Sequence, residues 1–124
     1  MSILFLQAYG RLIFFDLYLA RGNFVALYEQ VRRCTVGNRT GLPEAIARIC
    51  AAVDMACIWY PKQVLCLQRS AATACLLRQY GVRAEMVIGA QQVPFRAHAW
   101  VEAEGQVVND KSYTPEMYDV LDRC

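Results

Sequence analysis

The amino-acid sequence predicts an α+β fold in which helices come first and a small antiparallel sheet follows. Two observations carry this prediction. Apolar residues recur at helical spacings as far as Tyr80, and after Gly81 they change to the alternating pattern of strands. The chain has 124 residues, which is enough for one hydrophobic core but not for two, so a single domain is expected over 1–124.

Four segments are predicted to be helices, spanning 3–21, 24–31, 43–59 and 66–80. The first is apolar nearly all round, so we expect it to be buried or covered by a partner, and Gly22-Asn23 ends it. Pro43 is placed as the first-turn proline of the third helix, and Pro61 stops that helix. Gly81 follows the fourth helix where a left-handed cap belongs. The segment TVGNRTG, 35–41, is predicted to be a loop.

Three strands are predicted after the helices, at 83–89, 97–102 and 106–110. Residues 90–95, which include Pro94, are expected to form the loop between the first two strands. The tail from Ser112 to Cys124 is expected to form a short helix around Pro115-Glu116. Its apolar residues are expected to pack inside, namely Met117, Val120 and Leu121.

Composition and charge exclude several classes of protein. Apolar residues make up 56% of the chain and charged residues 19%, which excludes disorder and suggests a surface covered by a partner or substrate. The formal net charge is +2 and the basic residues are scattered, so nucleic acid is not an expected partner. Four polar residues interrupt the apolar N-terminal stretch, and we therefore expect no membrane span: Gln7, Arg11, Asp16 and Arg21.

The six cysteines are interpreted as thiols of a cytoplasmic protein. The N-terminus lacks both the positive region and the cleavage site of a secretory signal. The sequence has no C-x-x-C pair and one histidine, which argues against a zinc site. No metal or cofactor is therefore expected.

His98 is the only histidine, so any histidine-based mechanism must use it, although a lone ring between alanines is also typical of a packing residue. A three-residue loop at 103–105 would place Asp110 opposite His98 on the next strand, with Cβ atoms about 5 Å apart, and Trp100 on the same face. A two-residue turn at Glu104-Gly105 would instead pair His98 with Lys111 and send Asp110 to the other face.

Cys66 is placed to supply a nucleophile, because it begins the fourth predicted helix. Unpaired N–H groups and the helix dipole favour a thiolate there, although a small buried residue is the alternative interpretation. The other cysteines are interpreted as packing or incidental thiols. Cysteine at a helix start, followed by histidine and aspartate on neighbouring strands, is the arrangement of papain-like and transglutaminase-like thiol enzymes.

Five segments of the chain closely resemble the leader peptidases of lasso-peptide biosynthesis. The resemblance covers about residues 42–112, and its segments are CLQRS (66–70), LLRQYG (76–81), VIG (87–89), PFRAHAWVE (94–102) and GQVVND (105–110). It implies a transglutaminase-like (papain-like) cysteine protease core that cleaves the leader from a ribosomally made precursor. It also implies that Cys66 is the nucleophile, His98 the general base and then acid, and Asp110 the residue that orients the imidazole. The Cys66 N–H is the natural first oxyanion donor, and Gln63 is a candidate for the second.

The resemblance also implies partners. In this family a leader-recognition module is fused to the peptidase or is a separate chain, and residues 1–41 are too few for that module. We therefore expect 1–41 to be a helical extension, 42–112 the catalytic core and 113–124 a tail. A precursor peptide and a separate leader-recognition protein are the expected partners, and the lasso cyclase is a further candidate. The N-terminal helices are expected either to dock the recognition protein or to wrap the core.

Two other functions stay open at this point. One is another transglutaminase-like thiol acyltransferase, in which an amine replaces water. The other is a non-catalytic module that binds the precursor. Arg69 is expected either to hold a leader carboxylate or to rest its guanidinium on the loop, and Ser70 to bond back to its own helix.

Overall fold

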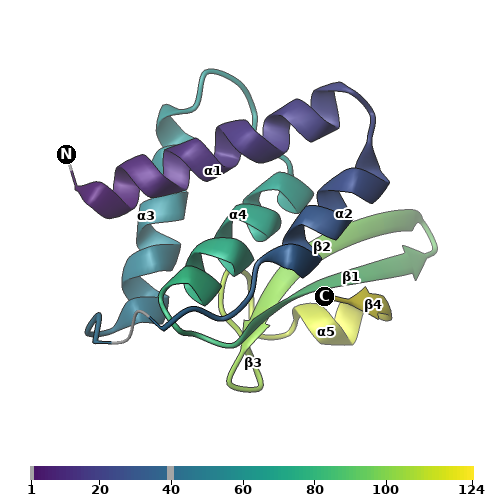
Figure 1. The fold of residues 1–124 in the computed structure, drawn as a ribbon. Helices are drawn as coiled ribbons and strands as arrows, with labels where there is room; N and C mark the ends of the chain where they lie inside the picture. The colour runs from purple at the N-terminus through teal and green to yellow at the C-terminus, as the bar shows by residue number, and fades with distance from the viewer. Residues whose placement is uncertain (1, 39–40) are drawn as a thin grey trace.

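A computed structural model describes residues 2–38 and 41–124, and its helices lie close to the predicted segments (Figure 1). They are α1 (Ile3–Ala20), α2 (Phe24–Arg33), α3 (Ala45–Trp59) and α4 (Cys66–Gln79). The side chains of Ser2 and Asn23 cap α1 and α2 by accepting hydrogen bonds from Phe5 N and Ala26 N. Gly81 follows α4 with a φ of +85°, as predicted.

The start of the third helix differs from the prediction. Helix α3 begins at Ala45 and not at Pro43, because Glu44 has the left-handed conformation with φ 52° and ψ 43°. A residue in that conformation cannot continue a right-handed helix. The predicted loop at 35–41 is a loop where it is described, and residues 39 and 40 of it lie outside the described residues.

The second half of the chain forms an antiparallel sheet in the order β3-β2-β1-β4. Its strands are β1 (Ala84–Gln92), β2 (Phe95–Ala103), β3 (Gln106–Val107) and β4 (Asp119–Arg123). The structure confirms the predicted α+β order, but two predicted boundaries differ. The predicted loop at 90–95 is mostly strand, because the chain turns within Val93-Pro94. The predicted strand at 106–110 ends at Val107.

The segment expected to be a tail contributes β4, which the sequence analysis missed. The short helix is present as α5 (Thr114–Met117), but β4 then pairs with β1 and forms an edge of the sheet. All five residues of β4 are exposed, so the strand lacks the alternation of buried and exposed residues that predicts strands. The expected packing of the tail is wrong, since Met117, Val120 and Leu121 are exposed.

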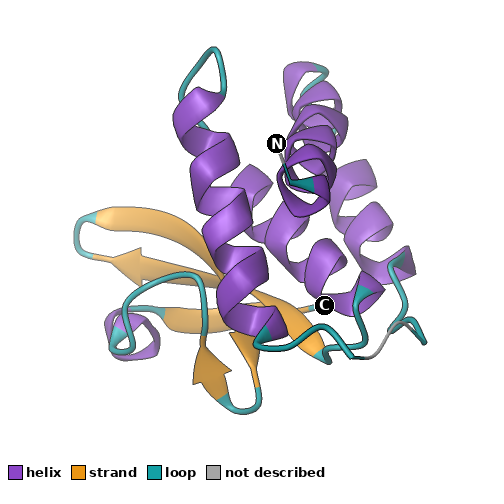
Figure 2. Ribbon diagram, turned by 90° about the vertical axis from the view of Figure 1, so that its left-hand side faces the viewer, coloured by secondary structure: helices purple, strands orange, loops and turns teal. Residues whose placement is uncertain are grey.

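Helix α4 lies between the sheet and the other helices. Every residue from Ser70 to Arg78 is buried. This helix contacts α1, α2 and α3 as well as β1 and β2, and Figure 2 shows the four long helices on one face of the sheet. Their buried side chains form one continuous hydrophobic cluster with β1 and β2. Residues of α4 are therefore held in fixed relation to the sheet.

Helix α1 presents two opposite apolar faces. The buried face packs into the core through Leu4, Ala8, Leu12 and Phe15. The other face is exposed and carries Ile3, Leu6, Ile13 and Leu17. The buried face confirms the expectation of a core helix. The exposed apolar face is where a partner could cover the helix, and that expectation stays a prediction.

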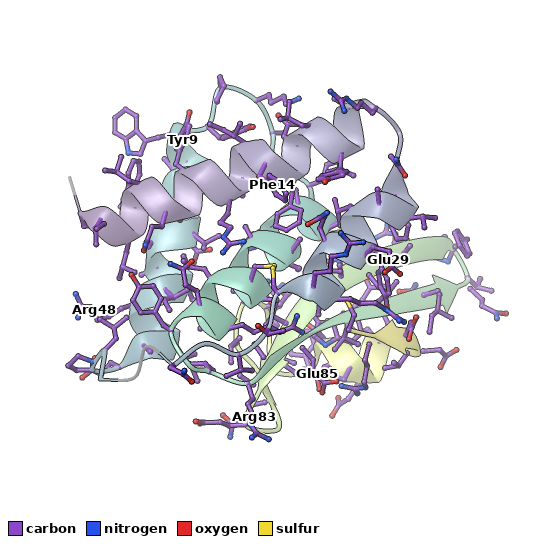
Figure 3. The ribbon with its side chains drawn as sticks, in the orientation of Figure 1. Tyr9, Phe14, Glu29, Arg48, Arg83 and Glu85 are labelled. Carbon is purple, nitrogen blue, oxygen red and sulfur yellow. The ribbon has the colours of Figure 1, made fainter. Side chains whose placement is uncertain are left out.

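The exposed face of α1 continues onto the end of α3 as a shallow apolar groove. The groove is lined by Phe5, Leu6, Tyr9, Gly10, Ile13 and Trp59. Figure 3 shows Tyr9 on the side of α1 that faces away from the sheet. Trp59 is 69% exposed, which is unusual for so large an apolar side chain.

By length and composition alone, α1 is a helix that could cross a membrane, with 22% of its residues buried in this fold. The polar residues of α1 therefore do not by themselves exclude a membrane span, contrary to the expectation from the sequence. In the fold they make specific contacts: Asp16 accepts a hydrogen bond from Tyr60 at 2.6 Å, and Arg11 donates to Gln79 at 3.1 Å. Packed helices of globular proteins pass the same test of length and apolarity.

Candidate active site

His98 and Asp110 form a direct pair. His98 lies within β2, Asp110 lies in the loop after β3, and Asp110 Oδ2 is 2.5 Å from His98 Nε2. Each side chain is 26% exposed, so the pair is shielded in part but open to a ligand. With Nε2 bonded to the carboxylate, Nδ1 is the ring nitrogen that can exchange a proton with a nucleophile.

The pair forms in the register that was expected to prevent it. Ala103 pairs with Gln106 and Glu102 with Val107, so the turn has the two residues Glu104-Gly105, both with positive φ. The expectation that this register separates His98 from Asp110 is wrong. The ladder ends with the bond from Val108 N to Val101 O at 3.0 Å, and the chain then leaves the sheet. Because Asp110 lies outside the strand, the alternation of side chains between the two faces of the sheet does not fix the direction of its side chain.

Two aromatic rings flank His98 on the face of the sheet opposite α4. The Tyr118 ring stacks on the imidazole with a centroid distance of 5.3 Å, and the Trp100 ring lies at 6.1 Å. Gly89 pairs with His98 across β1 and β2, and a Cβ on this glycine would lie 2.7 Å from the Trp100 ring. Trp100 lies beside His98 as expected. Tyr118 was missed as a site residue, because only the pairing of β4 with β1 brings it there.

Cys66 is the first residue of α4, as predicted. The first N–H groups of a helix have no intrahelical partners, and here the N-cap residue Leu65 makes no side-chain hydrogen bond to them. Among the described residues no hydrogen bond joins Cys66 Sγ to the His98 ring. The structure thus joins two of the three predicted catalytic residues, and the role of Cys66 stays a prediction.

The direction of α4 places Cys66 toward His98 along the sheet. Ser70 is joined through Asn109 to Val101 in β2. Eight residues later in α4, Arg78 donates to Ala84 O, and Ala84 pairs with Ala103 at the end of β2. Helix and strand therefore run in the same direction (Figure 1). Since His98 precedes Val101 in β2, the first turn of α4 lies nearer to His98 than its last turn does.

The carboxyl group of Asp110 is held in its charged form. Burial by itself raises the pKa of Asp110, but the hydrogen bonds from His98 and from Lys111 N, with the charges of His98 and Arg69, outweigh it and lower this pKa. Arg69 Nη2 donates to Asn109 O at 2.9 Å, so its guanidinium rests on the loop, which is one of the two expectations for this residue. Ser70 bonds to Asn109 and not back to its own helix, contrary to expectation.

The other cysteines differ from one another in their surroundings. Burial raises the pKa of the Cys50, Cys57 and Cys124 thiols. A hydrogen bond with Cys75 lowers the pKa of Cys34 against the effect of burial, and the charge of Arg11, 3.7 Å from the sulfur, assists. Within 2–38 and 41–124, no group of three or more His, Cys, Asp or Glu side chains is arranged to hold a metal ion.

Comparisons with known proteins show the family of the chain. The family model described as the transglutaminase-like superfamily matches residues 11–123. The chain is also similar to the microcin J25-processing protein McjB of Escherichia coli, with 43% identity over 56 residues. That match covers 45% of this chain and 26% of McjB, so the chain spans only part of the relative. No solved structure matches the chain at a significant level.

Proposed function

The chain belongs to the transglutaminase-like superfamily, and from this premise we propose that it is a cysteine peptidase that removes the leader peptide from a lasso-peptide precursor. The His98–Asp110 pair is the observation that carries the proposal, because a histidine oriented by a carboxylate activates a nearby nucleophile. The partial similarity to a microcin-processing protein supports a peptide precursor as the substrate.

In the proposed reaction, Cys66 attacks the last carbonyl of the leader. His98 accepts the thiol proton at Nδ1 and then gives it to the amine of the leaving core peptide, so a thioester joins the leader to Cys66. Water, deprotonated by His98, then attacks the thioester and releases the leader acid and the free thiol. Asp110 keeps the ring oriented and stabilises the imidazolium.

The first turn of α4 is suited to stabilise the oxyanion of this reaction. The N–H of Cys66 lies at a helix start without a side-chain cap, and the helix dipole favours negative charge there. Gln63 lies exposed in the preceding loop and remains our candidate for the second donor. An oxyanion donor of this kind contributes about 3–4 kcal/mol to transition-state stabilisation.

We further propose that a separate leader-recognition protein acts with this chain, in the cytoplasm, and that the lasso cyclase takes up the released core. The exposed apolar face of α1 and the groove that ends at Trp59 support a protein partner on that side. All six thiols are free, which supports a reducing compartment.

Cleavage of a synthetic precursor, leader plus core, tests the proposed activity. The purified chain is incubated with the precursor, with and without a recognition protein, and the products are identified by mass spectrometry. We expect a free leader acid and a free core. Cys66→Ala should lower the rate by about 10³-fold or more, because the nucleophile is lost.

Cys57→Ala is the matched control, because Cys57 is a half-buried thiol on α3 that the mechanism does not use. It should cleave at the wild-type rate. An intact precursor joined to an added amine would identify the chain as an acyltransferase. Undiminished product formation by Cys66→Ala would show that Cys66 is not the nucleophile. A precursor left intact and unmodified by the wild-type chain would identify it as a binding module instead.

A further inference from the structure

The loop that carries Asp110 is fastened by a side chain and not by a strand. Asn109 is only 8% exposed. Its Oδ1 accepts a hydrogen bond from Val101 N at 2.8 Å, in the place where a regular ladder would offer the carbonyl of Val108. Its Nδ2 donates to Ser70 Oγ at 3.2 Å. One side chain thus joins β2 to α4.

The chain changes direction because the Asn109 side chain, and not the backbone carbonyl of Val108, accepts the hydrogen bond from Val101 N. In the register of β2 and β3, an uninterrupted strand would carry Lys111 to a position opposite His98. Because Asn109 already occupies the N–H of Val101, the backbone leaves the sheet and Asp110 reaches the imidazole from the edge. A side-chain amide suits this task because it provides an acceptor and a donor together.

Arg69 holds the same loop by its backbone. Its Nη2 donates to Asn109 O at 2.9 Å and to Asp54 Oδ1 at 2.8 Å, which fixes the guanidinium between α3 and the loop. Arg69 and Ser70 stand three and four residues after Cys66, one helical turn into α4. The turn that begins with Cys66 therefore ends in the residues that hold the Asp110 loop.

We propose that Asn109, Ser70 and Arg69 are positioning residues that fix the His98–Asp110 pair relative to the start of α4. The proposal rests on the proposed function, in which this pair activates Cys66. The three residues act through Asp110 and touch no reacting atom. Without them, the loop is free to follow the strand register and withdraw the carboxylate from His98.

The kinetic effect should fall on the chemical step. Misplacement of a catalytic group by about 1 Å costs roughly 100-fold in rate. We therefore expect Asn109→Ala to lower kcat for precursor cleavage by about that factor with little change in KM. Arg69→Lys, which keeps the charge, should retain more activity than Arg69→Met.

A spectroscopic measurement tests the positioning without any substrate. His98 is the only histidine in the chain, so the imidazole ¹⁵N and ¹H signals of an untagged sample report this ring alone. In the wild-type protein the signals should show the proton on Nε2, donated to Asp110. Asn109→Ala and Ser70→Ala should lose that preference while circular dichroism shows the fold intact.

Thr73→Val is the matched control, because Thr73 is a buried hydroxyl of α4 that donates to Arg69 O at 2.8 Å. Among the described residues no hydrogen bond joins Thr73 to the loop of Asp110. Its ring signals should stay those of the wild type. If Asn109→Ala does not fold, Asn109→Asp and Ser70→Ala decide the question. Wild-type ring signals in these folded variants would overturn the positioning role. A wild-type chain that leaves the precursor intact would overturn the proposed function, while the ring signals still decide the role of the loop.

Discussion

At the scale of single residues, His98 is constrained by three different kinds of contact. Asp110 bonds one ring nitrogen, Tyr118 and Trp100 lie against the ring, and Gly89 leaves the space that these two aromatic rings occupy. The glycine is not needed for an unusual backbone angle, since its φ is not among the positive ones. It is needed because a side chain there would collide with the Trp100 ring and with Cβ of Tyr118.

Gly89→Ala should therefore destabilise the protein and disturb the site together. The added Cβ would lie 2.7 and 2.8 Å from Trp100 ring carbons and 2.9 Å from Tyr118 Cβ, so both side chains must shift. Overpacking of this kind costs about 1–3 kcal/mol. Urea unfolding should show that loss of free energy.

Gly10→Ala provides the control, because an added Cβ at Gly10 meets nothing within 4 Å. Alanine is also the better helix former, so this variant of α1 should be as stable as the wild type or more so by about 0.5–1 kcal/mol. Equal stability of Gly89→Ala and wild type would show that the rings beside His98 are loosely packed.

At the scale of elements, α1 is tied to the connection between α3 and α4 by one carboxylate. Asp16 accepts a hydrogen bond from Tyr60 at 2.6 Å and pairs with Lys62 at 2.9 Å. The Tyr60 and Lys62 bonds lower the pKa of Asp16, although burial opposes them. This contact holds the segment that leads into the first turn of α4, where Cys66 lies.

The stability of the protein should therefore fall in acid. Because the folded-state pKa of Asp16 lies below the unfolded value of about 3.9, the stabilisation is complete above that pH. It is lost as the pH falls through the folded-state pKa. Asp16→Asn should cost about 1 kcal/mol at neutral pH and make the unfolding free energy less dependent on pH between 5 and 2, as read from urea titrations at each pH.

Glu116→Gln is a suitable comparison, because Glu116 is an exposed carboxylate of α5. It should leave both the stability and its pH dependence close to those of the wild type. An Asp16→Asn variant with the full pH dependence of the wild type would show that other carboxylates, such as Asp110 and Glu102, carry the effect.

At the scale of the whole molecule, Arg78 connects segments that are far apart in sequence. This buried guanidinium donates to Val31 O at 2.6 Å, Ala84 O at 2.8 Å, Cys34 O at 3.1 Å and Cys124 O at 2.5 Å. It thereby holds α2, the start of β1 and the end of β4 around α4. No single ammonium group can reach acceptors in so many directions.

Arg78→Lys should consequently destabilise the whole fold. Several buried carbonyl groups lose their partners, and each hydrogen bond to a charged group contributes about 1.5–3 kcal/mol, so we expect a loss of about 3 kcal/mol or more in urea unfolding. Arg83→Lys, at an exposed position near the lower edge of the molecule in Figure 3, should change stability by less than about 0.5 kcal/mol. Similar stabilities of the two variants would contradict the role given to Arg78.

Local patterns predicted most of the secondary structure. Gly81 and Pro61 end their helices as expected, because backbone angles and missing N–H groups act within a few residues. Strand β4 was not predicted, because all its side chains are exposed and show no alternating pattern. Its strand conformation depends on its pairing with β1. The start of α3 was predicted wrongly, because nothing in the sequence indicates the left-handed conformation of Glu44.

The sequence by itself determined that helices precede a small antiparallel sheet, and it determined the chemistry available at Cys66, His98 and Asp110. These follow from residue types and spacings, which are local properties of the chain. Only the tertiary structure decided that His98 pairs with Asp110 in the register of the two-residue turn, which was expected to separate them. It also decided that Tyr118 stacks on the His98 imidazole. The physical reason is that Asn109 exchanges a ladder bond for contacts with β2 and α4, and such a choice depends on elements that are brought together only when the chain folds.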